Sequence, residues 1–286
     1  MAPGGFAIGS AHESISQQVN LRPRKAPARF LLPPSTVRPE LFSIGPLTIH
    51  SWGFMVAIAI GVGLLLARRN ASQAGLRKEE VVDLALVLAL AGLVGARILY
   101  VILEPAEFAG QPARLVNLSM GGMSIHGALA GGLIAGYVFA RAKRASFARL
   151  ADLLAVPLIA GQAIGRIGCF LNGDSYGKLA SVPWAVTFPN LYGARHPTQL
   201  YESALAVVAL VLLVALSKRL TRPGHLFLAY LIAYSAIRFF VELFRESEYL
   251  LPSLTYAQAA SVAIAAVALL LMLLPVVSPR LRRRSA

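Results

Sequence analysis

Seven long apolar segments constrain the fold of this chain more than any other feature of its sequence. Several of them approach or reach the roughly 20 residues that cross a lipid bilayer. They cover residues 52–66, 84–103, 126–140, 153–171, 200–216, 226–244 and 257–277. Only 14% of the 286 residues are charged, against roughly 25% in an average soluble domain. The sequence therefore predicts an all-α integral membrane protein with seven transmembrane helices.

The basic residues predict how these helices are oriented. The formal net charge is +14, and 15 of the 27 Lys and Arg residues follow the first, third, fifth or seventh segment. These are Arg68, Arg69, Arg77, Lys78, Arg141, Lys143, Arg144, Arg149, Lys218, Arg219, Arg222, Arg280, Arg282, Arg283 and Arg284. Cytoplasmic loops of membrane proteins are enriched in Lys and Arg. We therefore expect the N-terminus outside the cytoplasm, the C-terminus inside it, and no nucleic-acid partner.

The sequence divides into three parts. Residues 1–40 are rich in Pro and Ser and lack the continuous apolar run of a signal peptide, which predicts a disordered tail. Residues 41–278 form the transmembrane domain, and residues 279–286 form a basic cytoplasmic tail. The single cysteine, Cys169, allows no internal disulfide. The sequence contains neither a metal-ligand cluster nor a phosphate-binding P-loop, so we expect no metal and no cofactor.

Unusual polar residues stand at one end of every apolar segment. Alternate segments cross the membrane in opposite directions, so all of these residues are expected at the outer end. They are His50, Arg97, His126, Arg166, His196, Gln199, Glu202, Arg238, Arg245 and Gln258. Ionisable groups at membrane depth are costly unless they face a partner or a wet cavity. The pattern predicts one central polar cavity in the outer half of the bilayer.

Local spacing indicates what this cavity binds. In IRFFVELFRE, Arg238, Glu242 and Arg245 stand at i, i+4 and i+7, so one arginine remains for an anion. Gly165 and Gly168 are expected to let the backbone leave helical geometry beside Arg166. Guanidinium groups bind phosphate with charge-assisted, often bidentate hydrogen bonds. We expect the headgroup of an anionic phospholipid to be the ligand.

Seven short blocks in register also resemble a known family, the prolipoprotein diacylglyceryl transferases of bacteria. The blocks lie within residues 41–277 and read IGPLTIHSWG, GARILY, GGMSIHGALAGG, GRIGCFLNGDSYGK, RHPTQLYES, AIRFFVELFRE and LTYAQ. The resemblance implies a multi-pass protein of the bacterial inner membrane with a small extracytoplasmic head. Its members transfer the diacylglyceryl group of phosphatidylglycerol to the lipobox cysteine in the signal peptide of a prolipoprotein, and glycerol phosphate leaves.

The resemblance also implies roles for particular residues. It makes His126, Arg166 and Arg238 catalytic, with His126 a candidate base and the arginines stabilising charge on the departing phosphate. Residues at matching substrate-binding positions are His50, Arg97, Asn172, Asp174, His196, Gln199, Tyr201, Glu202, Glu242 and Arg245. An alternative source of the reactive thiolate is the field of the arginines.

Four residues depart from the family pattern inside these blocks. The family usually has Tyr at the position of Trp52, Gly at Ala128, Asn at Cys169 and Glu at Asp174. Two other functions stay open, the first because of these departures and the second because a transporter could also place arginines in a cavity open to lipid. The first is a catalytically weakened paralogue that binds phospholipid, and the second is a lipid transporter.

Overall fold

The structure is a computed structural model that describes residues 37–45, 47–108, 115, 122–189 and 191–274. Most of the predicted tail 1–40, and all of the tail 279–286, lie outside these residues. Within them, seven helices are long and apolar enough to cross a membrane, which confirms the predicted number. They are α1 (Ser51–Arg69), α2 (Lys78–Leu103), α3 (Ile125–Ala142), α4 (Phe147–Asn172), α5 (Thr198–Ser217), α6 (His225–Glu242) and α7 (Tyr256–Leu273).

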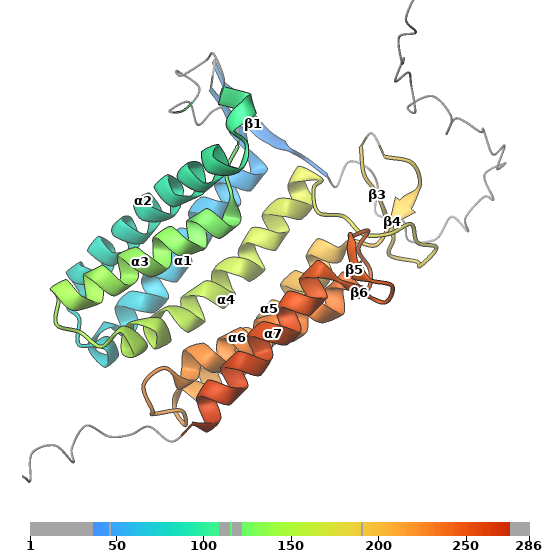
Figure 1. Ribbon diagram of the computed structural model, residues 1–286. Helices are drawn as coiled ribbons and strands as arrows, with labels where there is room; N and C mark the ends of the chain where they lie inside the picture. Colours follow the sequence, from blue (N-terminus) through green and yellow to red (C-terminus); the bar gives the residue numbers. More distant parts are fainter. Residues whose placement is uncertain (1–36, 46, 109–114, 116–121, 190, 275–286) are drawn as a thin grey trace, which may run out of the picture.

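Short strands mark one end of the helix bundle. In the described part of the chain they pair as three antiparallel hairpins: β1 (Glu40–Ile44) with β2 (Leu47–His50), β3 (Val186–Thr187) with β4 (Ala194–Arg195), and β5 (Tyr249–Leu251) with β6 (Leu254–Thr255). All three lie at the same end, called the strand end below (Figure 1). Two short 3-10 helices, η2 (Ala71–Ala74) and η3 (Pro105–Phe108), complete the elements. The predicted polar positions all fall at the strand end.

Helix α4 differs from the sequence expectation. The glycines at 165 and 168 do not interrupt it, because α4 runs as one helix of 26 residues to Asn172 and ends at Gly173 with a left-handed φ of 82°. Gly168 instead allows close packing, since a β-carbon there would lie 2.9 Å from the Cβ of Met55 on α1. The prediction of an unwound segment at Arg166 is therefore wrong. Arg166 projects from a regular helix.

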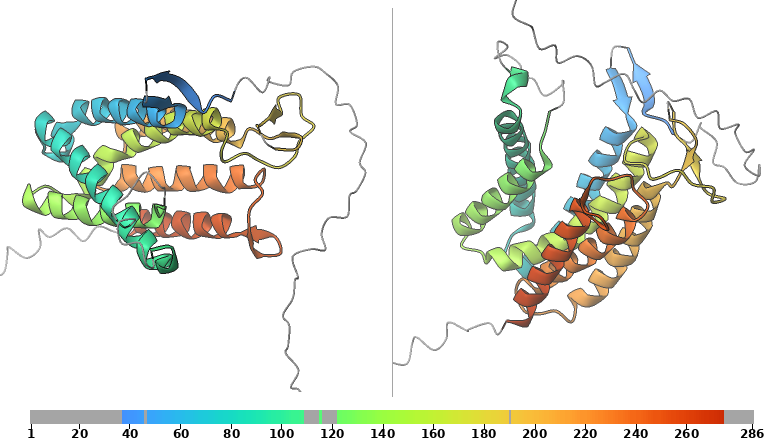
Figure 2. Two further views of the ribbon diagram at one scale, coloured as in Figure 1. Left: turned by 90° about the horizontal axis from the view of Figure 1, so that it is seen from above. Right: turned by 45° about the vertical axis from the view of Figure 1, so that its right-hand side comes forward.

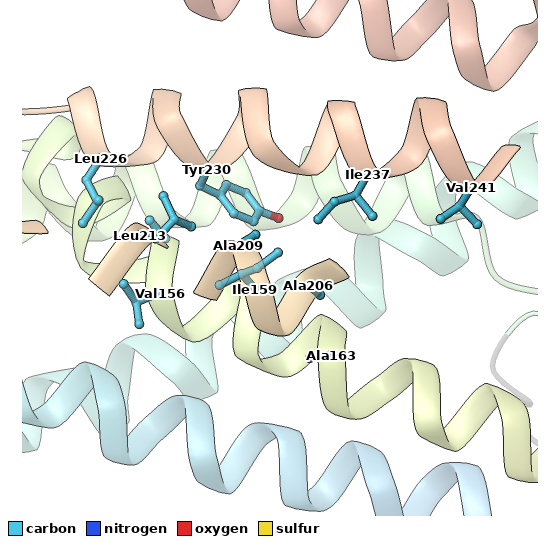
Figure 3. Packing of buried hydrophobic residues seen from close by; sticks show 11 residues of the cluster. Val156, Ile159, Ala163, Ala206, Ala209, Leu213, Leu226, Tyr230, Ile237 and Val241 are labelled. Carbon is cyan, nitrogen blue, oxygen red and sulfur yellow. The ribbon is translucent and has the colours of Figure 1, made fainter. Parts of the chain in front are cut away.

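The main hydrophobic core joins α4, α5 and α6. Its buried side chains come from all three helices and meet in the space between them (Figure 3). Ile159 on α4 is fully buried, and Leu213 on α5 and Val241 on α6 are 1% and 0% exposed. Ala163, Ala206 and Ala209 keep the backbones close, as small residues do in membrane helix pairs. This packing fixes the helices that carry the charged residues described below.

Helices α2 and α3 form a hairpin that packs closely on itself. A β-carbon on Gly95 would collide with the carbonyl oxygen of Gly127, and one on Gly131 would collide with that of Ala91. Against the rest of the bundle, the hairpin contributes to a second buried cluster with Ala67, Leu150 and Leu153, at the end opposite the strands. Toward the strand end the hairpin stands apart from α4 and α6 (Figures 1 and 2).

Candidate functional site

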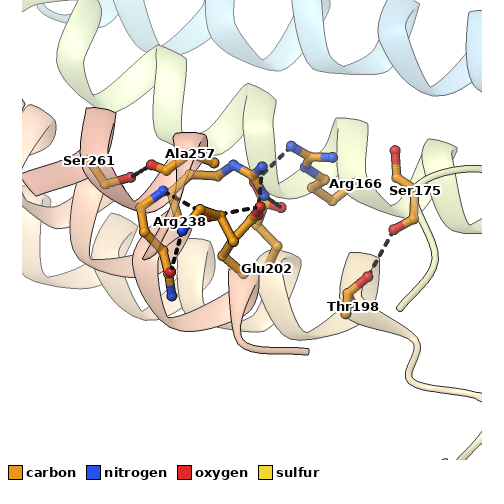
Figure 4. Close-up of polar contacts among 10 residues, drawn as sticks. Arg166, Ser175, Thr198, Glu202, Arg238, Ala257 and Ser261 are labelled. Atoms are coloured by element: carbon orange, nitrogen blue, oxygen red, sulfur yellow. Dashed lines mark hydrogen bonds and ion pairs between the residues drawn. The ribbon is translucent and has the colours of Figure 1, made fainter. Parts of the chain in front are cut away.

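Arginines and carboxylates from three helices meet at the strand end. The guanidinium of Arg166 on α4 lies 2.9 Å from the Glu202 carboxylate on α5, and Arg238 on α6 lies 3.9 Å from the same carboxylate. Arg238 also forms an ion pair of 2.9 Å with Glu242, one helical turn further along α6. Figure 4 shows Glu202 between the two arginines. Together with Arg245, these residues are called the charge cluster.

Burial differs between the two kinds of group in the cluster. The side chains of Glu202 and Glu242 are 2% exposed. The side chains of Arg166 and Arg238 are 22% exposed. The carboxylates are therefore held inside the protein. The two arginine side chains are partly accessible, although the Nη1 atom of Arg238 is buried. A guanidinium has five N–H donors and can bind a carboxylate and a phosphate at the same time.

Arg245 adds a third positive charge. Helix α6 ends at Glu242, so Arg245 lies beyond the helix and not at the predicted i+7 position on its face. Burial lowers the pKa of the Arg245 guanidinium, and the charges of Arg238 and Arg166 lower it further. Three guanidinium groups face two carboxylates, so the charge cluster carries one positive charge in excess. That excess suits an anion.

Helix α7 supports the cluster from the side of Glu242. The Thr255 hydroxyl donates to the Glu242 carboxylate at 3.3 Å. Thr255 and Gln258 also form the capping box that begins α7, with Gln258 Oε1 accepting from the Thr255 N–H at 3.1 Å. Gln258, one of the polar residues singled out in the sequence, is therefore engaged in starting α7. Through Thr255 it positions Glu242 and, in turn, Arg238.

Tyr234 belongs to the site and was missed in the sequence. Its side chain interacts with Arg166 across the α4–α6 contact. One turn deeper, Gln162 donates to the Tyr230 hydroxyl at 2.8 Å, and the rings of Tyr230 and Tyr234 stack 6.2 Å apart. The signal was the spacing of Tyr230, Tyr234, Arg238 and Glu242, each four residues apart on α6. Tyrosine is common in membrane helices, which hid this pattern.

The loop that follows α4 is tied to the start of α5. Gln199 donates to the Asp174 carbonyl, and the Thr198 hydroxyl donates to the Ser175 carbonyl at 2.8 Å (Figure 4 shows the second bond). Asn172 donates to the Asp174 carboxylate at 2.7 Å. Asn172, Asp174 and Gln199 thus form one hydrogen-bonded group that fixes the loop above Arg166.

His196 and Tyr201 form a separate aromatic group. The Tyr201 hydroxyl lies 3.0 Å from His196 Nδ1 and accepts from the Trp184 indole at 2.6 Å. Phe244 packs against both rings, with centroid distances of 5.1 Å and 5.7 Å. Burial lowers the pKa of His196, and nearby Lys178 lowers it further. Phe244 stands directly before Arg245, so this group borders the charge cluster.

Arg97, His126 and His50 belong to α2, α3 and the start of α1, and not to the three helices that carry the charge cluster. Arg97 donates to the carbonyls of Leu115 at 2.9 Å and Gly122 at 2.8 Å, and its guanidinium stands 5.1 Å from the centre of the Phe108 ring. His126 is the second residue of α3 and is exposed. His50 is exposed at the N-cap position of α1. The structure therefore brings together Arg166 and Arg238 but places His126 on the separate hairpin.

Three of the four departures from the family pattern are neighbours. Cys169 on α4 interacts with the side chains of Asp174 and Trp52, and it lies within electrostatic reach of Arg166. The fourth, Ala128, is on α3, where its carbonyl faces Gly92. Trp52, Cys169 and Asp174 therefore form one connected set beside the cluster.

Across the described ranges, no group of three or more His, Cys, Asp or Glu side chains could hold a metal ion.

Comparisons with known proteins give one consistent match. The family model described as prolipoprotein diacylglyceryl transferase matches residues 39–274. A phosphatidylglycerol–prolipoprotein diacylglyceryl transferase of Trichormus variabilis is 36% identical over 237 residues, which are 78% of this chain and 84% of the relative. Proteins of the same name from Bacillus cereus and Bacillus velezensis are 35% and 34% identical. They share 80% and 83% of this chain, and 89% and 92% of their own length.

Proposed function

The chain belongs to the prolipoprotein diacylglyceryl transferase family, and from this premise we propose that Arg166 and Arg238 bind the phosphate of phosphatidylglycerol. The protein is a multi-pass membrane enzyme with prolipoprotein diacylglyceryl transferase activity in lipoprotein biosynthesis. The relatives do not favour the two alternatives, a lipid-binding paralogue and a lipid transporter.

The observation that carries the proposal is the carboxylate shared by Arg166 and Arg238. Glu202 lies near two guanidinium groups from different helices, and both arginine side chains are 22% exposed. Charge-assisted hydrogen bonds from two fixed guanidinium groups suit the anionic oxygens of one phosphodiester. The excess positive charge contributed by Arg245 favours the anion further.

The chemistry is a displacement at carbon. The thiolate sulfur of the lipobox cysteine attacks the glycerol carbon that bears the phosphate. A C–S bond forms as the C–O bond breaks, and the electron pair of that bond leaves with the phosphate as glycerol phosphate. Negative charge develops on the departing oxygen, where fixed guanidinium groups stabilise the transition state more than the ground state. Arg166 and Arg238 perform this role, and Tyr234 and Glu202 orient Arg166.

The thiol must lose its proton during this reaction, since its ordinary pKa is about 8.5. Two sources of thiolate stay open in the proposal. His126 accepts the proton as a general base, as the family resemblance implies, or the three arginines stabilise the thiolate directly. The pH profile of the His126→Gln variant separates them. Loss of the rate increase near neutral pH supports His126, and an unchanged profile supports the arginines.

The orientation of the protein in the membrane follows from the distribution of charge. Basic residues surround the end opposite the strands, including exposed Arg141, Arg144 and Arg219. Under the positive-inside rule this end faces the cytoplasm and the strand end faces outward. This orientation puts the charge cluster in the outer leaflet, and we infer the bacterial inner membrane from the family resemblance.

The test is transfer by purified full-length protein in vesicles. A model prolipoprotein gains the mass of one diacylglyceryl group in vesicles that contain phosphatidylglycerol, and gains none in vesicles of phosphatidylethanolamine alone. Arg166→Lys and Arg238→Lys are expected to lose most activity, because lysine cannot bind two oxygens in a fixed plane. Arg141→Lys, at an exposed position in the last turn of α3, is the control. Full activity in the first two variants would exclude the proposed roles.

A further inference from the structure

A polar pair lies one helical turn deeper in the bundle than Arg166. Gln162 on α4 donates from its amide to the Tyr230 hydroxyl on α6, at a distance of 2.8 Å. Tyr230 is 6% exposed and lies within the hydrophobic core that joins α4, α5 and α6 (Figure 3). Neither residue belongs to the seven sequence blocks that resemble the family.

Packing alone does not account for this pair. The oxygen of the Gln162 amide is buried and, within the described residues, has no hydrogen-bond partner. An unpaired buried polar group is destabilising, whereas replacing both members of a polar pair by apolar groups of the same shape is nearly neutral. Leucine and phenylalanine at these two positions would therefore join α4 to α6 at least as well. What a hydrogen bond adds to an apolar contact is direction, because it weakens steeply when its angle changes.

The pair is in line with the residues of the charge cluster. Gln162 precedes Arg166 by four residues on α4. On α6, Tyr230 precedes Tyr234 by four residues and Arg238 by eight. Residues four apart lie on the same face of a helix, about 6 Å apart along its axis. Two facing rows of polar residues therefore run toward the strand end, and the pair forms their inner end.

The ring of Tyr230 transmits the direction of this hydrogen bond to Tyr234. The two rings stack with their centroids 6.2 Å apart and an angle of 11° between their planes. Offset stacking at such distances is favourable. The Phe227 ring also contacts Tyr230, at a centroid distance of 5.5 Å. Since Gln162 holds the hydroxyl, the Tyr230 ring cannot turn or slide without breaking that bond, and Tyr234 stacks on a fixed surface.

Tyr234 in turn limits the orientation of Arg166. The Arg166 guanidinium donates to the Tyr234 hydroxyl and forms the 2.9 Å ion pair with Glu202. The ion pair alone would let the guanidinium rotate about the line that joins it to the carboxylate. A second contact from another helix removes this rotation. The plane of the guanidinium matters because bidentate phosphate binding depends on it.

We propose that Gln162 and Tyr230 are positioning residues, which fix the ring of Tyr234 and through it the plane of the Arg166 guanidinium. This inference rests on the proposed function and extends the site by one helical turn into the core. The two residues act through Tyr234 and not on the substrate. Their removal should therefore lower kcat for diacylglyceryl transfer more than it raises KM for phosphatidylglycerol.

Two single substitutions test each half of the pair. Gln162→Leu and Tyr230→Phe keep the approximate size of the side chain and remove the hydrogen bond. A displacement of about 1 Å at a catalytic group can cost about 100-fold in rate, and we expect the smaller rotation of Arg166 to lower kcat about tenfold in either variant. Each variant also leaves one buried polar group unpaired, so its thermal unfolding midpoint should fall.

The double variant, Gln162→Leu with Tyr230→Phe, separates positioning from stability. It leaves neither partner unpaired, so its unfolding midpoint should return to about the wild-type value. Its kcat should stay about tenfold low, because the direction of the bond is still lost. Recovery of kcat together with the midpoint would overturn the proposal. Ser261→Ala is the control, since it removes a buried hydroxyl that donates to the Ala257 carbonyl on α7 at 2.7 Å, and it should keep kcat.

A spectroscopic readout does not depend on transfer. The full-length protein carries 3-fluorotyrosine at position 234, and its fluorine resonance is recorded in detergent without substrate. Arg166→Lys gives the resonance of a Tyr234 that has lost the guanidinium. We expect the double variant to broaden the wild-type resonance or move it toward that of Arg166→Lys, and Ser261→Ala to leave it in place. An unchanged resonance in the double variant would overturn the proposal.

The two proposals fail in different ways. If the resonance moves but the wild-type protein never transfers a diacylglyceryl group, the proposed function fails and the positioning of Tyr234 stands. If transfer occurs and depends on Arg166, but the double variant keeps both the wild-type resonance and the wild-type kcat, the positioning assignment fails alone.

Discussion

The Arg166 guanidinium lies 2.9 Å from the Glu202 carboxylate, and this contact joins α4 to α5 at the depth where Arg238 approaches from α6. Because the two residues lie on different helices, no local sequence pattern predicts this ion pair. One buried carboxylate thus sets the spacing of two cations. The geometry that we assign to phosphate binding depends on a residue that never needs to touch the lipid.

Glu202→Gln should therefore impair the reaction without changing either arginine. The amide keeps the size of the side chain but loses the charge that aligns both guanidinium groups. We expect kcat to fall about 10–100-fold, which is roughly 1.4–2.7 kcal/mol of lost transition-state stabilisation. Transfer to a model prolipoprotein measures it. Glu246→Gln, at an exposed ion pair, is the control and should keep near wild-type activity. An unchanged kcat in Glu202→Gln would contradict the alignment role.

Gly127→Ala tests the packing of the α2–α3 hairpin. A methyl group at this position would meet the Gly95 carbonyl, which belongs to a helix backbone and cannot move aside. Overpacking of this kind costs about 1–3 kcal/mol. The thermal unfolding midpoint in detergent should fall. Gly132→Ala is the matched control, because a β-carbon there meets nothing within 4 Å. Equal midpoints for the two variants would show that the hairpin tolerates separation.

Arg97→Lys should act on stability more than on substrate binding. Lysine keeps the charge but cannot donate to both the Leu115 and Gly122 carbonyls in the same geometry. Hydrogen bonds from charged groups contribute about 1.5–3 kcal/mol each. We expect a lower unfolding midpoint and an unchanged KM for phosphatidylglycerol. The reverse result, a normal midpoint with a raised KM, would return Arg97 to the substrate-binding role that the family resemblance implies.

The connected set of Trp52, Cys169 and Asp174 predicts coupled effects on activity. Cys169→Asn restores the usual family residue and should retain activity. Combined with Asp174→Glu, it should give more activity than the two single effects predict, because contacting residues show coupling of about 0.5–3 kcal/mol. A double-mutant cycle on kcat/KM measures this coupling. Ala128→Gly, on α3, is the control departure and should combine additively with Cys169→Asn. Additivity in both pairs would mean that the set has no shared role.

His196 predicts a dependence of stability on pH. Its folded pKa lies below the ordinary value because of burial and Lys178, so the unfolded chain binds the proton more tightly. Stability should therefore be highest above about pH 6.5, the ordinary histidine pKa, and should fall as the pH drops toward the folded value. Unfolding midpoints between about pH 5 and pH 8 show the slope. His196→Gln should reduce this slope. A slope unchanged in His196→Gln would assign it to other groups.

Much of the fold could be predicted because its cause is local. Apolar runs of sufficient length specify membrane helices in any context. Since successive helices cross in opposite directions, the polar residues at the ends of these helices could all be assigned to the same end of the bundle. The ion pair of Arg238 and Glu242 was predictable for the same reason, since both residues lie on one helix face. The continuity of α4 was not predictable, because glycine permits both an unwound backbone and close packing. Only the position of Met55 shows which one applies at Gly168.

The site itself depends on contacts between helices that no local pattern encodes. Glu202 was identified as a polar residue at a helix start, but its pairing with Arg166 required the packing of α4 on α5. Tyr234 was missed because its role appears only across the contact with α4. His126 and Arg97 were grouped with the arginines since all stand at the same end. Sharing an end does not place residues on the same helices, and the hairpin separates them.

The α2–α3 hairpin joins the rest of the bundle through a buried cluster at the end opposite the strands, so a rotation about that cluster would move its strand end most (Figures 1 and 2). The pivot of this rotation is the buried cluster around Leu150. Helix α2 has 26 residues and is therefore about 39 Å long. A tilt of about 5° at the pivot would displace the far tip by roughly 3 Å over that length. Such a tilt would change the separation between the hairpin and helices α4 and α6 at the strand end (Figures 1 and 2).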